Sequence, residues 1–170
     1  MGTMDAMANE EDRQAALRLS GQPSELGRSY GLEPLRLCLY RITRGRLGQP
    51  KGWPDPPQLS TPWQDTISPT RSGWRQRAAN LHGETVFGVD YKVCRRCKLA
   101  WVEEPHNEPE YQRCGLAKAG LAALRTDFPQ MACHTLGGHF SDVHAFWSSV
   151  SAGVRGGYEQ RDLCPQVVRY

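Results

Sequence analysis

The chain has 170 residues, enough for one domain that buries about 70% of its unfolded surface and folds without disulfide or metal cross-links. Its hydrophobic fraction of 39% and charged fraction of 23% are those of a globular protein, and its formal net charge is only +3. No apolar run approaches the roughly 18 residues that a membrane span needs, and the acidic start of the chain is not a secretory signal, so we expect a cytoplasmic protein with no membrane partner.

The first 30 residues differ in pattern from the rest of the chain. They carry one short helical signal, Asp12–Leu19, which glycine and proline follow within a few positions. We expect an arm or a short helix docked on the domain. Residues 31–170 should then form that single domain, beginning with a strand where polar and apolar residues alternate over Pro34–Thr43.

Residues 45–74 predict an irregular insert. This segment holds six prolines, too many for a long helix or a central strand, together with Trp53 and Trp63. An irregular segment of this length is usually functional or disordered, and the two tryptophans indicate that part of it packs on the domain. The insert could serve as a lid or as a wall of the substrate site.

The clearest strand is Thr85–Val93, whose residues alternate between two faces. We expect it to pair antiparallel with Lys98–Glu104. That pairing places Cys94 and Cys97 at the tip of a hairpin. One C-x-x-C motif supplies half of a tetrahedral zinc site.

A glycine turn follows the hairpin and an acidic loop. Gly115 precedes an amphipathic helix with Leu116, Leu121 and Leu124 on one face. Glycine lets the backbone approach a ligand closely, and the first amides of a helix, with its dipole, favour an anion. The unit predicts a pyrophosphate-binding turn; the alternative is an ordinary strand–turn–helix unit in which Gly115 serves packing.

The turn reads Gln112-Arg113-Cys114-Gly115-Leu116-Ala117. In this pattern and its context the chain resembles the GNAT superfamily of N-acyltransferases over residues 85–160. The resemblance implies an α/β (α+β) fold, with a mixed, largely antiparallel sheet flanked by helices, and acetyl-CoA as cosubstrate. It implies a bulged strand whose opened backbone pairs with the pantetheine arm. The implied coenzyme-binding residues are Val102, Gln112, Arg113, Cys114, Gly115, Leu116 and Ala117.

The last third of the chain predicts a strand at Met131–Leu136, a helix capped by Ser141 or Asp142, and a final strand near Tyr158–Val168. The helix resembles the late helix of the family. There a tyrosine often protonates the departing thiolate. Here Trp147 stands at the matching position, and an indole cannot serve as that acid.

Acyl transfer to an amine needs a base, an oxyanion stabiliser and an acid for the thiolate. Glu103 and Glu104 end the strand beside which the thioester would lie, so they are the candidate bases. A solvated acidic loop is the alternative interpretation. His139 and Tyr158, with His144, are the candidate acids in place of Trp147.

Topology suggests the other half of the zinc site. A strand parallel to Leu99–Glu104 should bring Cys133 and His134 beside Cys97, and a returning antiparallel strand should bring Cys164 to the same end. We expect a structural zinc site formed by Cys94, Cys97, His134 and Cys164, with Cys133 as an alternative to His134. A free dithiol or a disulfide are the other interpretations.

The expected function is N-acetylation of an amine by acetyl-CoA. The acceptor could be a small molecule, a protein or an aminoacylated RNA. The alternative is a non-catalytic acyl-CoA-binding or zinc-stabilised module that contacts protein or nucleic acid. Residues 35–77 carry eight basic side chains against two acidic ones, which would suit phosphates but also a solvated face. A homodimer is compatible with either function.

Overall fold

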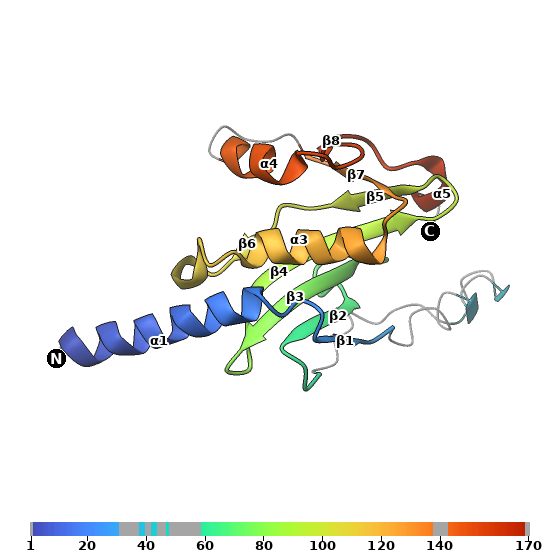
Figure 1. The fold of residues 1–170 in the computed structure, drawn as a ribbon. Coiled ribbons are helices and arrows are strands. Elements are labelled where there is room, and N and C mark those ends of the chain that lie inside the picture. The colour runs from blue at the N-terminus through green and yellow to red at the C-terminus, as the bar shows by residue number, and fades with distance from the viewer. Residues whose placement is uncertain are drawn as a thin grey trace.

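The computed structural model describes residues 2–30, 38–39, 42–43, 47, 59–137 and 143–168, with side chains from residue 10 onward. Its centre is an eight-stranded mixed sheet in the order β1-β2-β3-β4-β5-β7-β8, with β6 paired to β4 (Figure 1). The strands are β1 (Leu26–Arg28), β2 (Trp63–Ile67), β3 (Arg75–Leu81), β4 (Glu84–Cys94), β5 (Leu99–Val102), β6 (His106–Asn107), β7 (Ala132–Thr135) and β8 (Glu159–Gln160). The helices are α1 (Gly2–Ser20), the 3₁₀ turn η1 (Pro109–Tyr111), α3 (Leu116–Asp127), α4 (His144–Ser151) and α5 (Pro165–Val168).

Strand direction follows the predicted hairpin and crossover. From β2 to β5 each strand runs antiparallel to the next, whereas β1 and β2 are parallel, and β5 and β7 are parallel because α3 connects them. This confirms the mixed α/β architecture, the β4–β5 pair and the strand predicted at Met131–Leu136. The helix after Gly115 is confirmed as well.

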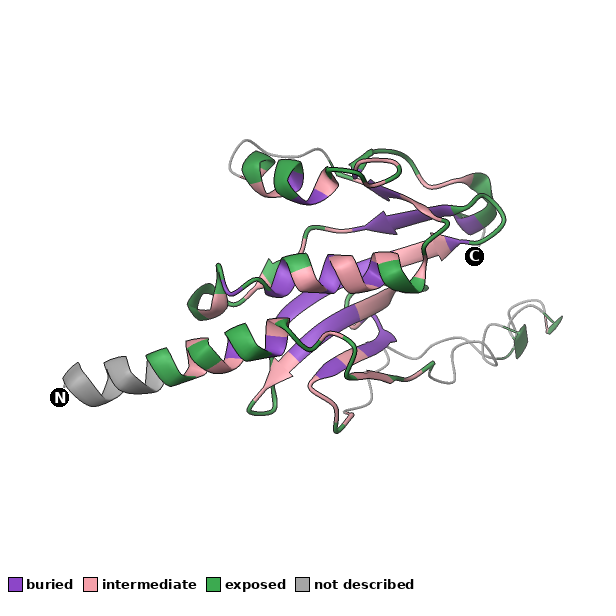
Figure 2. Cartoon of the chain, viewed as in Figure 1, coloured by how far each residue is buried: buried purple, intermediate pink, exposed green. Residues whose placement is uncertain are grey.

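One face of the sheet carries the larger core. Helices α1, α3 and α4 cover this face, and their apolar residues join Trp63, Phe87 and Val89 from the sheet in one cluster (Figures 1 and 2). Helix α3 lies so close that a Cβ on Gly120 would come within 2.6 Å of the Phe87 ring. Glycine at this position therefore sets the distance between helix and sheet. The indole of Trp63 donates to the carbonyl of Leu19 at 2.9 Å and fixes the end of α1.

The opposite face of the sheet carries a smaller apolar cluster that includes residues of the C-terminal segment. Trp74, Leu99, Trp101 and Val167 form it, with Cys94. The indole of Trp101 donates to the carbonyl of Arg161 at 3.0 Å. The C-terminal segment therefore packs across this face.

A buried ion-pair network joins the sheet to the end of α3. Arg77 is fully buried and donates to Asp65 at 2.8 Å and to Asp127 at 2.6 Å. Asp65 also accepts hydrogen bonds from Arg75 and from the Tyr91 hydroxyl. Burial and the carboxylate of Asp65 raise the pKa of Tyr91, so this hydroxyl stays protonated and continues to donate.

Three predictions about the chain need correction. Trp63–Ile67, inside the predicted irregular insert 45–74, forms strand β2, because the flanking prolines lie just outside it. The strand predicted at Pro34–Thr43 falls mostly outside the described residues, and at Cys38, Leu39 and Ile42 the backbone is helical. The final strand near Tyr158–Val168 is only the two residues of β8, followed by a loop and the short helix α5, and β8 runs parallel to β7 and not antiparallel as expected.

The N-terminal helix is longer than its sequence signal, since it runs over Gly2–Ser20 rather than Asp12–Leu19 alone. It is docked on the domain through Ala16 and Leu19, both buried. Ser141 and Asp142, the predicted caps of α4, lie outside the described residues. Of the helices that are described, none has the length and apolarity needed to cross a membrane.

Candidate functional site

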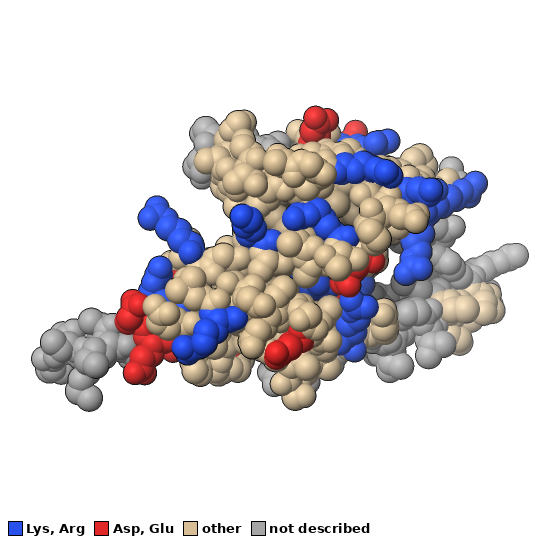
Figure 3. Space-filling model, viewed as in Figure 1, with Lys and Arg blue, Asp and Glu red and all other residues tan. Residues whose placement is uncertain are grey.

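A groove of about 700 Å³ lies between the N-terminal end of α3 and helix α4. Its wall on one side is the loop from Glu104 to Lys118, and on the other it is Val143, Phe146 and Trp147. Figure 3 shows this region as a hollow below α4 with basic side chains along the α3 side. The groove is therefore apolar on its α4 side and cationic on its α3 side.

The strand beside the groove carries a bulge. Gly88 and Tyr91 of β4 pair with His106 and Val102. Two residues lie between Gly88 and Tyr91 on β4, but three residues, 103–105, lie between Val102 and His106 on the partner side. One extra residue therefore lies on the β5–β6 side. Strand β7 pairs with β5 only as far as Val102↔Thr135. Among the described residues, no strand borders residues 103–107 on that side, so the backbone after Val102 has no strand partner there.

The turn at the start of α3 has the backbone that its sequence predicts. Gly115 has φ 81° and Arg113 has φ 65°, both in the left-handed region. No described side chain caps the helix, and its first turn has no acidic residue. The first amides of a helix have no acceptor within it. They therefore face the groove with their hydrogen-bonding capacity and the positive end of the helix dipole available to an anion.

Most of the predicted coenzyme-binding residues line this groove. They are Gln112, Arg113, Gly115, Leu116 and Ala117, and Lys118 joins them. Cys114 instead points into the core, and Val102 is buried where it pairs with Tyr91 and Thr135. These two side chains support the loop and the strand from behind.

The two candidate bases point to different places. Glu104 lines the groove. Glu103 does not; its carboxylate accepts from Arg71 at 3.0 Å, in a pair whose side chains are 22% and 43% exposed. Successive residues of an extended chain point to opposite faces, which explains the difference. Only Glu104 is placed to meet a ligand in the groove.

The candidate acids are arranged differently from the expectation. Tyr158 is buried away from the groove, and its hydroxyl accepts a hydrogen bond from Arg125 at 2.9 Å. Burial raises its pKa to about 12. Trp147 lines the groove and packs its ring 5.3 Å from that of Tyr158. His144 is exposed outside the groove lining, and His139 lies outside the described residues.

One further titratable side chain of the groove was not among the predicted site residues. His106 lies on β6 and lines the groove, with its Nε2 3.3 Å from a Glu108 carboxylate oxygen. The signal was its place in the acidic loop beside Glu104, but the chain pattern showed no strand there. Bulge and groove together bring Glu104 and His106 to the same site.

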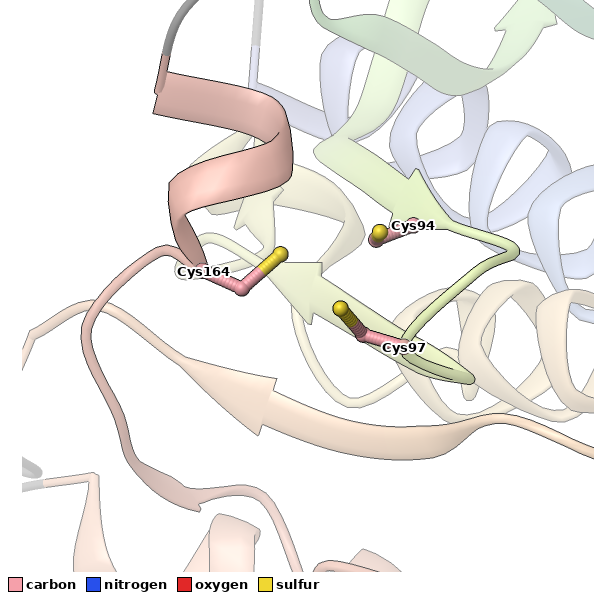
Figure 4. Close-up of side chains that lie close together, drawn as sticks. All are labelled: Cys94, Cys97 and Cys164. Atoms are coloured by element: carbon pink, nitrogen blue, oxygen red, sulfur yellow. The ribbon is translucent and has the colours of Figure 1, made fainter.

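Three of the predicted metal ligands come together at the other end of β5. The Sγ atoms of Cys94, Cys97 and Cys164 all lie within 4.8 Å of one another and point toward one another (Figure 4). All three are free thiols. Such a group could bind a metal ion, and three thiolates are compatible with structural zinc.

The fourth predicted ligand lies elsewhere. The register of β5 with β7 explains this. Leu99, the partner of Cys94, pairs with Ala132, whereas His134 pairs with Trp101, two residues further along the sheet from Cys94. The His134 ring is buried, with Nδ1 3.2 Å from the carbonyl oxygen of Glu159. Its alternative, Cys133, is buried in the core on the opposite face. Neither residue joins the cysteine group.

Comparison of the chain with protein-family models, with curated proteins and with solved structures finds no match. What the site can do therefore follows from its own geometry. It offers a groove with a helix N-terminus and two titratable side chains, and separately a cluster of three thiols.

Proposed function

We propose that this protein is an acyl-CoA-dependent N-acetyltransferase. The observation that carries the proposal is the bulged β5–β6 edge, which opens beside the uncapped N-terminus of α3 in one groove. A long ligand with a phosphate group at one end and a chain of amides behind it suits this combination. Coenzyme A has that chemistry, since its pantetheine arm carries two amide groups.

The coenzyme would lie along the groove. Its pyrophosphate would meet the amides at the start of α3, with Arg113 and Lys118 supplying positive charge. Its pantetheine amides would pair with the backbone after Val102, where β7 no longer covers the strand edge. The apolar side chains of α4 would cover the arm from the other side. This order brings the thioester toward Glu104 and His106.

The transfer itself needs groups that handle protons. The amine nitrogen attacks the thioester carbonyl, a C–N bond forms and the C–S bond breaks. Glu104 would accept the proton that the amine loses, directly or through a water molecule. A proton must also reach the departing thiolate, and His106 lines the groove and could supply one. Tyr158 cannot, because its hydroxyl is buried against Arg125.

A second candidate function rests on Trp147. Its indole lines the groove but cannot protonate a departing thiolate, which supports a module that binds acyl-CoA without transferring the acyl group. Contact with protein or nucleic acid would then be its activity. The cysteine cluster takes no part in either function, because Cys94 and Cys97 flank the start of β5 whereas the groove lies beyond its end.

The test is calorimetric titration of the protein with acetyl-CoA, comparing Gly115→Trp with Gly83→Trp. Both glycines have positive φ, 81° and 86°, and a Cβ at either position would clash with no neighbour, since the Ser20 hydroxyl 3.5 Å from a Cβ at Gly115 is in ordinary contact; only Gly115 lines the groove. We expect acetyl-CoA to bind the wild type and Gly83→Trp alike and Gly115→Trp at least about tenfold more weakly. Equal affinity in the three proteins, or no binding to any, would remove the proposal.

Transfer is measured separately, as release of free coenzyme thiol with a panel of amines. Release that depends on the amine supports the acetyltransferase. Binding without release for any amine would favour the second candidate function.

A further inference from the structure

The cysteine cluster joins two parts of the chain that are far apart in sequence. Cys94 ends β4 and Cys97 lies in the turn to β5, while Cys164 immediately precedes α5. Their three Sγ atoms lie within 4.8 Å of one another. Four tetrahedral ligands at the zinc–sulfur distance of about 2.3 Å would hold sulfur atoms about 3.8 Å apart. The thiols are therefore close to the positions that a zinc ion would require.

The turn from Cys94 to β5 has a strained backbone just after Cys97. Lys98, directly after Cys97, has φ 54°, a left-handed conformation that costs a residue other than glycine about 1–2 kcal/mol. The same residue is fixed from β7, because the amide of Ala132 donates to its carbonyl at 2.9 Å. The turn brings the Cys97 thiol back toward Cys94.

Charge around the cluster suits a metal–thiolate complex. A zinc ion with three thiolates carries one net negative charge. Arg95, Arg96 and Lys98 lie in and beside the same turn. Arg96 also donates to the side chain of Gln166 at 3.2 Å, which adds a second link between the turn and the C-terminal segment. These cationic side chains would offset the net negative charge of such a complex.

The cluster lies where the C-terminal segment needs support. Helix α5 has four residues, too few to be stable alone. The segment contacts the sheet through Val167 and Leu163 in the small apolar cluster and through the bond from Trp101 to Arg161. A bound metal would add a cross-link between the hairpin and this segment.

We propose that Cys94, Cys97 and Cys164 bind one zinc ion, with water as its fourth ligand, and that this ion fastens residues 161–168 across Trp101. No other His, Cys, Asp or Glu of the described chain joins the three thiols. Cys97 is exposed, so the fourth position faces solvent. Binding zinc releases the thiol protons to solvent and involves no oxidation. This site is independent of the proposed acetyl transfer.

The test measures zinc per chain by native mass spectrometry, on reduced protein comprising residues 1–170 and supplied with zinc. We expect one ion in the wild type and in Cys38→Ser, whose exposed thiol stands outside the cluster. Cys97→Ser and Cys164→Ser should bind zinc at least about tenfold more weakly. Because the Cys97 side chain is exposed, its replacement tests the site even if Cys164→Ser fails to fold.

The function of the ion is tested by hydrogen exchange. Removing zinc from the wild type with a chelator should speed amide exchange at residues 161–168 and leave α3 unchanged. Equal zinc content in wild type, Cys97→Ser and Cys164→Ser would overturn the site. So would a reduced wild type that holds no zinc. Unchanged exchange at residues 161–168 would overturn the fastening role.

Discussion

The guanidinium of Arg77, with no exposed surface, donates to the carboxylate of Asp127 at 2.6 Å. This bond ties strand β3 to the last residue of α3. Since the N-terminus of the same helix forms one end of the groove, the ion pair helps to fix the position of the proposed coenzyme site from the far end of the helix.

Replacing Arg77 with leucine should lower the free energy of unfolding by about 3–5 kcal/mol, because it removes the buried guanidinium that joins Asp65 to Asp127 and leaves Asp65 only Arg75 and Tyr91 as partners. Chemical denaturation measures the change. The control is Arg71→Leu, which removes the partly exposed pair with Glu103 and should cost at most about 1 kcal/mol. Similar losses in both variants would contradict the importance of burial.

The free energy of unfolding should fall in acid as Asp127 becomes protonated and loses its ion pairs. Burial opposes its ionisation, but the hydrogen bonds and charges of Arg77 and Arg28 outweigh burial and hold its pKa below the usual 3.8. Because the pKa of Asp127 is lower in the folded than in the unfolded protein, its ion pairs stabilise the fold fully at pH values above the unfolded-state pKa. This stabilisation is lost as the pH falls through the folded-state pKa.

Melting temperature measured from neutral pH down into this range should therefore drop below about pH 4. Asp127→Asn should melt lower at neutral pH and show a shallower drop in acid. An identical acid profile for the two proteins would assign the transition to other carboxylates.

Glu104→Gln should slow acetyl transfer at saturating acetyl-CoA by about 100-fold or more, since an amide cannot accept the proton. The adjacent Glu103→Gln is a close control, because that side chain pairs with Arg71 outside the groove lining. Steady-state rates with an amine that releases coenzyme thiol give the comparison, and the acetyl-CoA dissociation constant should change in neither variant. Equal rates in both would exclude Glu104 as the base.

Gly120→Ala should destabilise the fold by about 1–3 kcal/mol, although alanine favours helix more than glycine does. The added Cβ would meet the Phe87 ring at 2.6 Å and push α3 from the sheet. Thr126→Ala, on an exposed position of the same helix, supplies the control. Thermal melting measures the difference in stability. If Gly120→Ala is more stable than the wild type, the Phe87 ring can move to make room for the Cβ.

The hairpin, helix α3 and strand β7 could be predicted because their apolar residues follow regular periods of two or 3.6. Strand β2 could not. It is five residues long between Pro62 and Pro69, and its pairing with β3 rather than its own composition makes it a strand. Local pattern carries no information about such tertiary pairing.

The candidate sites show the same limit. Cys164 joins Cys94 and Cys97 as expected, but it does not lie on a returning antiparallel strand, because β8 ends at Gln160 and runs parallel to β7; Cys164 instead immediately precedes the short helix α5. His134 was a wrong prediction as a partner of these thiols because the register of β7 could not be read from the sequence, and a shift of two residues moves a side chain about 7 Å. His106 joined the groove only through pairing of β6 with β4.

The parallel pairing of β1 with β2 has a consequence for the order of folding. Residues 29–62 separate these strands, whereas β3 and β4 are joined by a tight hairpin. Closing a long loop costs more entropy than closing a short one, and contacts distant in sequence form slowly. The hairpins should therefore assemble first, and β1 should join as one of the last strands, completing that edge of the sheet only after the rest has a surface to receive it.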